Sequence, residues 1–404
     1  MDKLNKPSEF GQYYLIIGFI TLFWGLYAGT IVDRFNRKRV FLGLTGAGAL
    51  VIGSITAIGY YLNGLPELLV VCVFATTFFI YNLHYPSLYA FMQEITERRL
   101  YGKITSYLEV QGQFTSMLAG ACAVILLEGT PGGTFELFGV SLNIGFTLEP
   151  WPLRKIFLLD TITYVLSFLI VSTIVFVPLV QRNIDSSGLV QRIKNGVEYL
   201  KKNPLVFIFG NASYFVFVTT LIIGFYLMAV YVSDVLKAEG NVYATGEMLF
   251  AFGSLMAGVA SAQLFKRFEA VDTIAGLATI TTSVFVALFI STDVNVFYLG
   301  AFLLGFSNAS IRIQRVTFLF RIVPNDVIGR ASSVFFIFNT LFRLIFIGMI
   351  FKFFTEPDKV PYAMLMLAIF VSIGVLILLS FKSPLIALGR EEDAKAASEN
   401  NNAG

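Results

Sequence analysis

Apolar residues fill the chain in long runs, and short polar segments separate one run from the next. About eleven runs are long enough to cross roughly 30 Å of hydrocarbon as helices. They cover residues 11–32, 40–62, 68–92, 104–127, 155–179, 205–230, 245–265, 272–291, 295–320, 329–352 and 361–381. This pattern predicts an all-α polytopic membrane protein with about eleven transmembrane helices.

Composition agrees with this class and argues against several others. Hydrophobic residues make up 56% of the chain, charged residues 14%, and the mean hydropathy is +0.75, which no soluble domain is expected to match. The net charge is only +3 and forms no basic stripe, so we expect no nucleic-acid partner. Cys72 and Cys122 lie inside apolar runs, and His84 is the single histidine. We therefore expect no metal site, no cofactor, no catalytic residues and no enzyme activity.

The polar segment after the first run concentrates cations in a very short loop. It reads Gly29-Thr30-Ile31-Val32-Asp33-Arg34-Phe35-Asn36-Arg37-Lys38-Arg39. Cations in short loops mark the cytoplasmic side of a membrane. Alternating sides from this loop puts most lysines and arginines in the cytoplasm, the N-terminus outside and the C-terminus inside. Asp33 ends a helix, where the helix dipole disfavours an acid, so it needs a cationic partner or another helix N-terminus.

This segment resembles the signature loop that follows the second helix of transporters of the major facilitator superfamily (MFS). The matching residues are Gly29, Asp33, Arg34, Arg37 and Lys38, whereas Asn36 stands where the family usually has glycine. Asparagine tolerates a left-handed backbone, so we expect the family's turn to be kept. The loop here follows the first run, and the family's first helix is therefore expected to be missing from this chain.

Two shorter segments narrow the resemblance to one branch of the family. Leu158-Leu159-Asp160, which opens a helix, and the segment 195–204 resemble the macrolide-efflux and enterobactin-exporter branch. The spacing from Asn82 to Gly102 is echoed from Asn308 to Gly329, as expected for two related halves.

We therefore expect two pseudo-symmetric helical bundles. The N-terminal bundle covers 1–180 with about five helices, and the C-terminal bundle covers 204–383 with about six. Between them, 181–203 is expected to be a cytoplasmic amphipathic linker, because Leu189, Ile193, Val197 and Leu200 share one helical face suited to a lipid surface. The tail, 384–404, is expected to be disordered. In the external loop Glu128–Lys155, alternating apolar residues allow a small hairpin.

Polar residues inside the apolar runs are candidates for a central cavity, because a charge in hydrocarbon costs at least about 2.5–3.5 kcal/mol on insertion scales. Arg343 is the deepest cation, and Arg312 and Arg315 share one helical face. The resemblance places several of these positions on cavity-lining helices. The candidate cavity residues are His84, Tyr85, Asn211, Tyr214, Asn308, Arg312, Arg315 and Arg343. For Arg343 and Glu109 a fixed interhelical ion pair is the alternative, and for His84 a plain hydrogen-bonding role.

What the resemblance implies is transport by alternating access, in which two halves rock about a central site. The gating residues would be Gly29, Asp33, Arg34, Arg37, Lys38, Glu94, Gly329 and Arg330. Asp33 would sit at the N-terminus of the helix that begins near Gly329. Arg37 would bridge to Glu94 or Glu97. The candidates for proton coupling are Glu109, Asp160 and His84.

The expected function is a secondary active exporter of small amphipathic molecules, drug-like or siderophore-like, in a bacterial inner membrane. Its partners would be the small-molecule substrate, the lipid bilayer and protons as a candidate coupling ion, and we expect a monomer. Two alternatives stay open. One is a lysophospholipid flippase of the same fold, and the other is a non-transporting truncated fragment or scaffold.

Overall fold

The computed structural model describes residues 13, 16–21, 24, 27, 31–32, 35–97, 100–137, 140–143, 145–175, 189–238, 240–264, 268–324, 327–354 and 356–402. Within these ranges, ten helices are long and apolar enough to cross a membrane. They correspond to the second through eleventh predicted runs, so the all-α polytopic class is confirmed. The first run, 11–32, lies partly outside the described residues, and the expected loss of the family's first helix stays a prediction.

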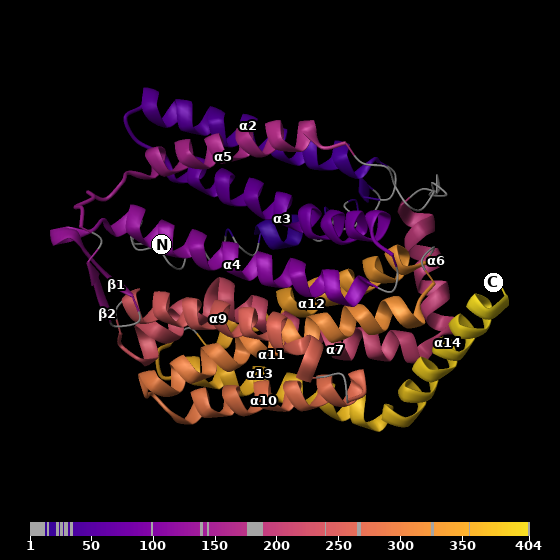
Figure 1. Cartoon of the computed structure of the whole chain (residues 1–404). Helices are drawn as coiled ribbons and strands as arrows, with labels where there is room; N and C mark the ends of the chain where they lie inside the picture. Colours follow the sequence, from indigo (N-terminus) through magenta and orange to yellow (C-terminus); the bar gives the residue numbers. More distant parts are fainter. Residues whose placement is uncertain are drawn as a thin grey trace. The chain divides into compact units, whose positions relative to one another are not determined.

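Two compact units make up the chain. The N-terminal unit comprises residues 1–101 and 121–189, and its helices are α2 (Arg37–Tyr61), α3 (Glu67–Ile95) and α5 (Leu153–Thr173). α2 packs along both α3 and α5 (Figure 1). The ring of Tyr164 on α5 fills the space that a Cβ at Gly48 on α2 would need, so the two helices approach closely there. α4 (Tyr101–Glu128) contributes residues to both units.

A small hairpin interrupts the helical pattern, as the alternation in the loop Glu128–Lys155 predicted. Strand β1 (Thr134–Leu137) pairs antiparallel with β2 (Val140–Asn143), and it follows the short helical turn η2 (Pro131–Gly133). The hydroxyl of Thr130 joins the two chain segments at the base of the hairpin through two hydrogen bonds. It donates to the carbonyl oxygen of Phe146 over 3.0 Å and accepts from the amide of Leu148 over 2.7 Å.

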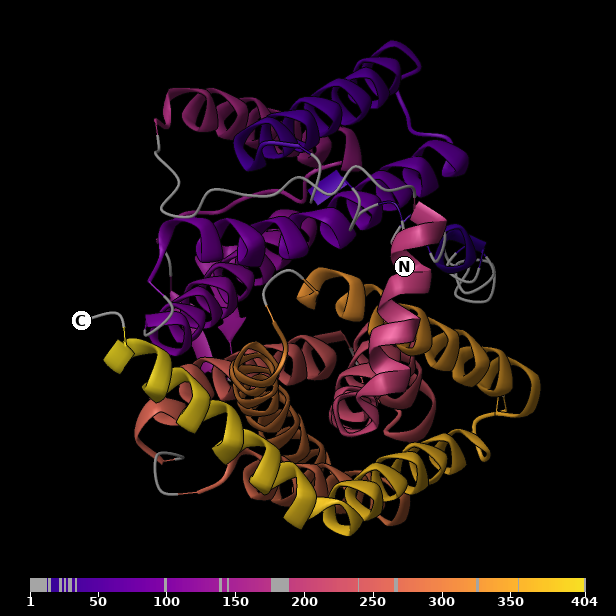
Figure 2. The ribbon, with the colours of Figure 1, turned by 90° about the vertical axis from the view of Figure 1, so that its right-hand side faces the viewer.

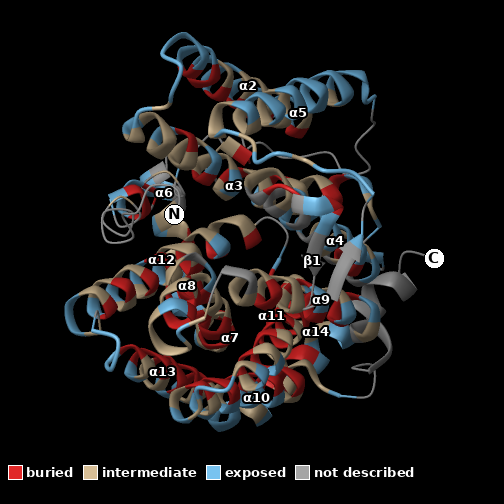
Figure 3. Ribbon diagram, turned by 90° about the vertical axis from the view of Figure 1, so that its left-hand side faces the viewer, coloured by how far each residue is buried: buried red, intermediate tan, exposed pale blue. Residues whose placement is uncertain are grey.

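The C-terminal unit comprises residues 102–120 and 190–404. Its elements are α6 (Leu189–Lys202), α7 (Pro204–Ile222), α8 (Met228–Val230), α9 (Gly240–Leu264), α10 (Ala270–Ile290), α11 (Val294–Ile322), α12 (Ile328–Phe353), α13 (Val360–Ser380) and α14 (Lys382–Asn402). Buried residues are dense on α7, α10, α11 and α13, whereas α5 of the N-terminal unit has none (Figure 3). Exposed apolar faces of this kind suit helices that contact lipid.

Glycines allow α9 and α11 to touch backbone to backbone. Gly253 faces the carbonyl of Phe302, and Gly305 faces the carbonyl of Phe250, so a Cβ at either position would overlap the facing helix. The hydroxyl of Ser254 donates to the carbonyl of Gly305 over 3.0 Å. Small residues and an interhelical hydrogen bond are the means by which helices associate in lipid.

The sixth predicted run continues past α7 through two π-helical turns, η3 (Ile223–Leu227) and η4 (Tyr231–Val235). The buried hydroxyl of Tyr231 lies 2.8 Å from the carbonyl oxygen of Leu288 and 2.9 Å from that of Ser291. These carbonyls end α10, where backbone acceptors have no partner within the helix. Tyr231 therefore caps α10 from a neighbouring segment.

The predicted amphipathic linker forms a helix, α6, but its apolar face packs against protein. Leu200 is buried, and Gly196 lies against the carbonyl of Arg330 at the start of α12. Contact with α12 therefore buries part of the apolar face of α6 that was expected to lie on lipid.

The expectation of a disordered tail at 384–404 is wrong as far as residue 402, because this segment forms α14. Its side chain Leu385 is 0% exposed, Lys382 Nζ lies 2.6 Å from Asp272 Oδ1, and Arg321 pairs with Asp393. Figure 2 shows α14, in yellow, crossing the ends of other helices of the C-terminal unit. An alanine-rich charged segment has good helix propensity, and these contacts stabilise the helix.

Candidate functional site

Arg37 of the signature segment forms an ion pair with Glu94 in the N-terminal unit. Arg37 is the first residue of α2 and is 4% exposed; Glu94, in the last turn of α3, is 8% exposed. Arg37 Nε lies 3.7 Å from Glu94 Oε1, so the contact expected between these residues is present. Each charge occupies the unfavourable end of its own helix dipole, and the pair neutralises both. Its role in gating stays a prediction.

Asn36 departs from the expected left-handed turn. Its φ is −58° and ψ is 130°, and its side chain accepts a hydrogen bond from the amide of Lys38 over 2.9 Å. Asn36 is therefore the N-cap of α2, a position that asparagine favours. The amine of Lys38 donates to the carbonyl of Ser172 over 2.7 Å, at the end of α5, where the helix dipole favours a cation.

The other gating candidates are placed only in part. Gly29, Asp33 and Arg34 lie outside the described residues. Gly329 and Arg330 open α12, where the hydroxyl of Ser333 donates to the carbonyl of Gly329 over 3.0 Å.

Arg315 is the most enclosed of the cavity candidates. It lies on α11 and is 2% exposed. Its guanidinium stacks 3.7 Å from the ring centre of Tyr214 on α7, and its Nη1 donates to the carbonyl of Ser213 over 3.1 Å. The ring of Phe217 lies 5.7 Å away. The structure thus joins two candidates, Arg315 and Tyr214, in one cation–π contact.

The remaining candidates of the C-terminal unit occupy separate positions. Arg312 and Asn308 lie one and two turns before Arg315 on α11, with Arg312 half-buried and Asn308 buried. Asn211 uses its side chain within α7, donating to the carbonyl of Phe207 over 2.9 Å. Arg343 is 5% exposed in α12.

His84 and Tyr85 lie on α3 among aromatic rings. The His84 ring is 5.5 Å from that of Phe41 and 5.6 Å from that of Tyr85, both edge-on. Asp160 is half-buried in α5, and the side chain of Glu109 on α4 is outside the described residues.

Glu247 is an ionisable residue that the sequence reasoning missed. The predicted run began at 245, which put Glu247 at a helix end. In the structure α9 begins at Gly240, so Glu247 lies two turns inside the helix and is half-buried. Tyr243, one turn before it, shares its face. The signal that could have revealed it is Gly240, a helix-boundary residue five positions before the apolar run.

Comparison with known proteins places these features in a family. The sequence profile of the Major Facilitator Superfamily matches residues 1–347. No curated protein sequence matches the chain significantly.

Several solved structures share the fold at low sequence identity. A bacterial homologue of the iron transporter ferroportin, in its outward-facing state, is 16% identical with a TM-score of 0.60, over 92% of this chain and 89% of that one. The human organic anion transporter MFSD10 is 10% identical with a TM-score of 0.63, over 91% and 83%. The nucleoside transporter NupG is 12% identical with a TM-score of 0.57, over 92% and 90%. The chain therefore belongs to the major facilitator superfamily of membrane transporters.

Proposed function

We propose that the protein is a secondary active exporter of small amphipathic organic anions in a bacterial inner membrane. The observation that carries the proposal is the buried guanidinium of Arg315, stacked on Tyr214 inside a spanning helix. Arginine stays charged at every physiological pH, and a charge at membrane depth marks a functional site by default. A cation held against an aromatic ring offers an organic anion both a counter-charge and a flat apolar surface.

The charge balance within the C-terminal unit supports an anionic substrate. Away from the helix ends, the described spans of this unit carry the cations Arg312, Arg315 and Arg343, and the acids at such positions are Glu109 and Glu247. MFSD10, which shares the fold, is an organic anion transporter, and that activity agrees with this choice of substrate. The short segments that resemble the macrolide-efflux and enterobactin-exporter branch support export as the direction.

Alternating access and proton coupling complete the proposal. The Arg37–Glu94 pair joins the start of α2 to the end of α3, so this end of the N-terminal unit keeps its shape while the two halves rock. We add Glu247 to Glu109, Asp160 and His84 as a candidate proton carrier, because protonation removes the cost of a carboxylate inside a spanning helix.

The test measures transport by the purified full chain in liposomes. Uptake of a labelled aromatic carboxylate should exceed that of an amine with the same apolar part, and a proton gradient should increase it. Arg315→Gln should abolish the preference for the anion. Arg315→Lys should retain the charge but weaken binding, because lysine lacks the planar group that stacks on Tyr214.

Lys359→Gln is the matched control, since it removes an exposed cation of the same unit outside the spans. Equal transport of anion and amine by the parent protein would refute the substrate class. A preference unchanged in Arg315→Gln would refute the assignment of Arg315 as the substrate's counter-charge.

A further inference from the structure

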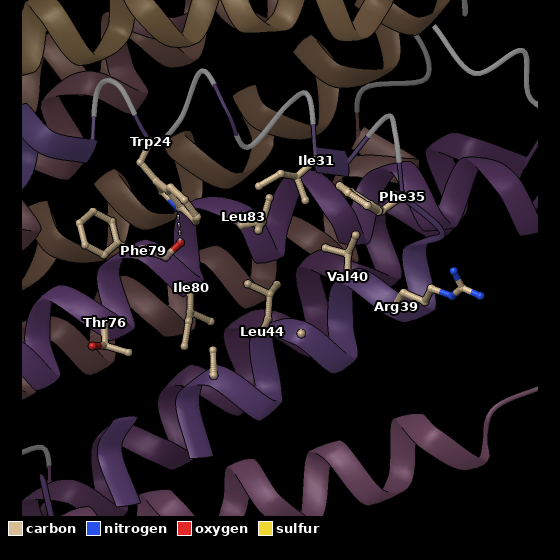
Figure 4. A pocket seen from close by; sticks show the side chains of 12 residues that line it. Trp24, Ile31, Phe35, Arg39, Val40, Leu44, Thr76, Phe79, Ile80 and Leu83 are labelled. Carbon is tan, nitrogen blue, oxygen red and sulfur yellow. Dashed lines mark hydrogen bonds between the residues drawn. The ribbon is translucent and has the colours of Figure 1, made fainter. Parts of the chain in front are cut away.

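An apolar cavity of about 390 Å³ lies within the N-terminal unit. α2 lines it with Val40, Gly43, Leu44 and Ala47, and α3 lines it with Thr76, Phe79, Ile80 and Leu83. Both sets repeat at i, i+3, i+4 and i+7, so each helix presents one continuous stripe to the cavity. Trp24, Ile31 and Phe35 complete the wall (Figure 4).

The cavity runs parallel to the spanning helices. Each stripe runs over eight residues, which are seven steps of 1.5 Å, so the cavity is about 10 Å long. Trp24 and Phe79 lie toward the end of the cavity that is farther from Arg39 (Figure 4), where the indole Nε1 of Trp24 donates to the carbonyl of Phe79 over 3.2 Å. The volume falls in the range of small-molecule sites, and a dry apolar void of this size forfeits dispersion contacts.

A single cation stands at the opposite end. Figure 4 shows Arg39 beyond the row of apolar side chains, with its guanidinium pointing away from them. Arg39 is the last residue of the signature segment, lies in the first turn of α2 and is exposed. Within the described ranges it makes no ion pair. α2 therefore places a cation at the membrane surface, and the apolar cavity extends from that cation into the hydrocarbon.

We propose that this cavity binds one acyl chain of an anionic phospholipid, whose phosphate group pairs with Arg39. A bilayer phospholipid has the alignment that the cavity requires, with its phosphate at the surface and its chain parallel to the helices. Arginine binds phosphate through a bidentate fork, which favours it over a simple surface attraction. The site does not involve Arg315 or the C-terminal unit, so it is independent of the proposed transport function.

Trp24 gives a direct probe for the chain in the cavity. The protein has two tryptophans, and Trp151→Phe leaves Trp24 as the single emitter. The full-length variant is placed in phosphatidylcholine nanodiscs that contain increasing fractions of phosphatidylglycerol with brominated acyl chains. Quenching of Trp24 should reach half its maximum at a fraction at least about tenfold lower than with brominated phosphatidylcholine, because one charge-assisted hydrogen bond is worth about a factor of ten.

Two variants, each with a matched control, distinguish binding of the acyl chain in the cavity from binding of the headgroup by Arg39. A Cβ at Gly43 would meet nothing within 4 Å, so Gly43→Leu extends an apolar side chain into the cavity and should abolish the specific quenching. Gly276→Leu makes the same change at an open position of α10 and should leave it unaffected. Arg39→Gln should weaken the phosphatidylglycerol effect about tenfold, whereas Lys194→Gln, which removes an exposed cation of α6, should not.

Three results would overturn the proposal. They are equal quenching by the two brominated lipids, unchanged quenching in Gly43→Leu, and displacement of the lipid by inorganic phosphate alone. Arg315→Gln should retain the quenching even where transport is lost, so this proposal and the proposed function fail independently.

Discussion

Neutralising one partner of the Arg37–Glu94 pair should destabilise the protein more than neutralising both. Both side chains are buried, and 3.7 Å separates Arg37 Nε from Glu94 Oε1. Charges about 4 Å apart attract by about 4 kcal/mol at an effective dielectric constant of about 20. Removing one partner of a buried pair leaves an uncompensated charge and costs about 3–5 kcal/mol. The distance between Arg37 Nε and Glu94 Oε1 exceeds that of a charge-assisted hydrogen bond. We therefore expect each single variant to lose about 3 kcal/mol of unfolding free energy, the lower end of this range.

A double-mutant cycle measures this coupling. Arg37→Gln, Glu94→Gln and the double variant are compared with the parent by equilibrium unfolding of the purified protein in a titration with SDS. The double variant should lose no more than about 2 kcal/mol, because it buries two neutral amides and no unpaired charge. The coupling free energy is then about 4 kcal/mol.

The exposed pair Lys359–Glu356 provides the control cycle. Its Nζ and Oε2 atoms are closer, at 2.7 Å, yet both side chains are largely in solvent, so no coupling should be measurable. If the effects of Arg37→Gln and Glu94→Gln simply add, to within about 0.5 kcal/mol, the two charges do not stabilise one another and the reasoning is refuted.

Three further substitutions test other parts of the structure. Gly305→Ala should lower the thermal unfolding temperature markedly, because its Cβ would overlap the carbonyl of Phe250, whereas Gly276→Ala should be neutral. Leu385→Ala should cost about 2–5 kcal/mol of α14 docking and expose this helix to proteolysis, whereas Arg390→Gln, in an exposed pair with Glu269, should not. Glu247→Gln should remove the stimulation of transport by a proton gradient while anion exchange continues; loss of both would point to a structural role.

The sequence predicted the spans well because lipid imposes a simple condition on them. A helix that crosses hydrocarbon must be apolar along its whole length, and that property is visible without any knowledge of tertiary contacts. The hairpin β1–β2 was visible for a similar reason, since its alternation has the period of a strand. The contact of Arg37 with Glu94 was expected from the resemblance, because both residues are charged and lie at the same end of neighbouring helices.

Side-chain roles were harder to predict because hydrogen bonds to the nearby backbone compete with the roles expected in a turn or a cavity. Asn36 was expected to replace a glycine in a left-handed turn, but its side chain instead accepts from the amide of Lys38. Asn211 was expected in a cavity, and its amide donates to the carbonyl of Phe207 in its own helix. A polar side chain in a helix has its own backbone as an available partner, which composition and spacing do not exclude.

The tail and Glu247 were missed for a different reason, because each depends on where a helix ends. The composition of 384–404 is typical of a disordered segment, and the burial of Leu385 and the ion pairs of Lys382 and Asp393 reveal a docked helix. The five residues before the predicted run, 240–244, belong to α9, so Glu247 lies inside the span and not at its start. Helix boundaries are the least certain feature of a hydropathy pattern, and ionisable residues cluster at them.

Different interactions stabilise the interior of each unit, and this difference connects the two proposals. In the C-terminal unit, α9 and α11 meet through backbone contacts, the rings of Phe215 and Phe370 stack 4.1 Å apart, and α14 packs across the helix ends. In the N-terminal unit, α5 has no buried residue and a 390 Å³ cavity separates parts of α2 and α3. Rocking of two halves requires each half to keep its shape. The C-terminal unit does so through protein contacts, whereas the N-terminal unit would need lipid in its cavity. Removal of lipid should therefore increase hydrogen exchange in α2 and α3 before it does so in α9 and α11.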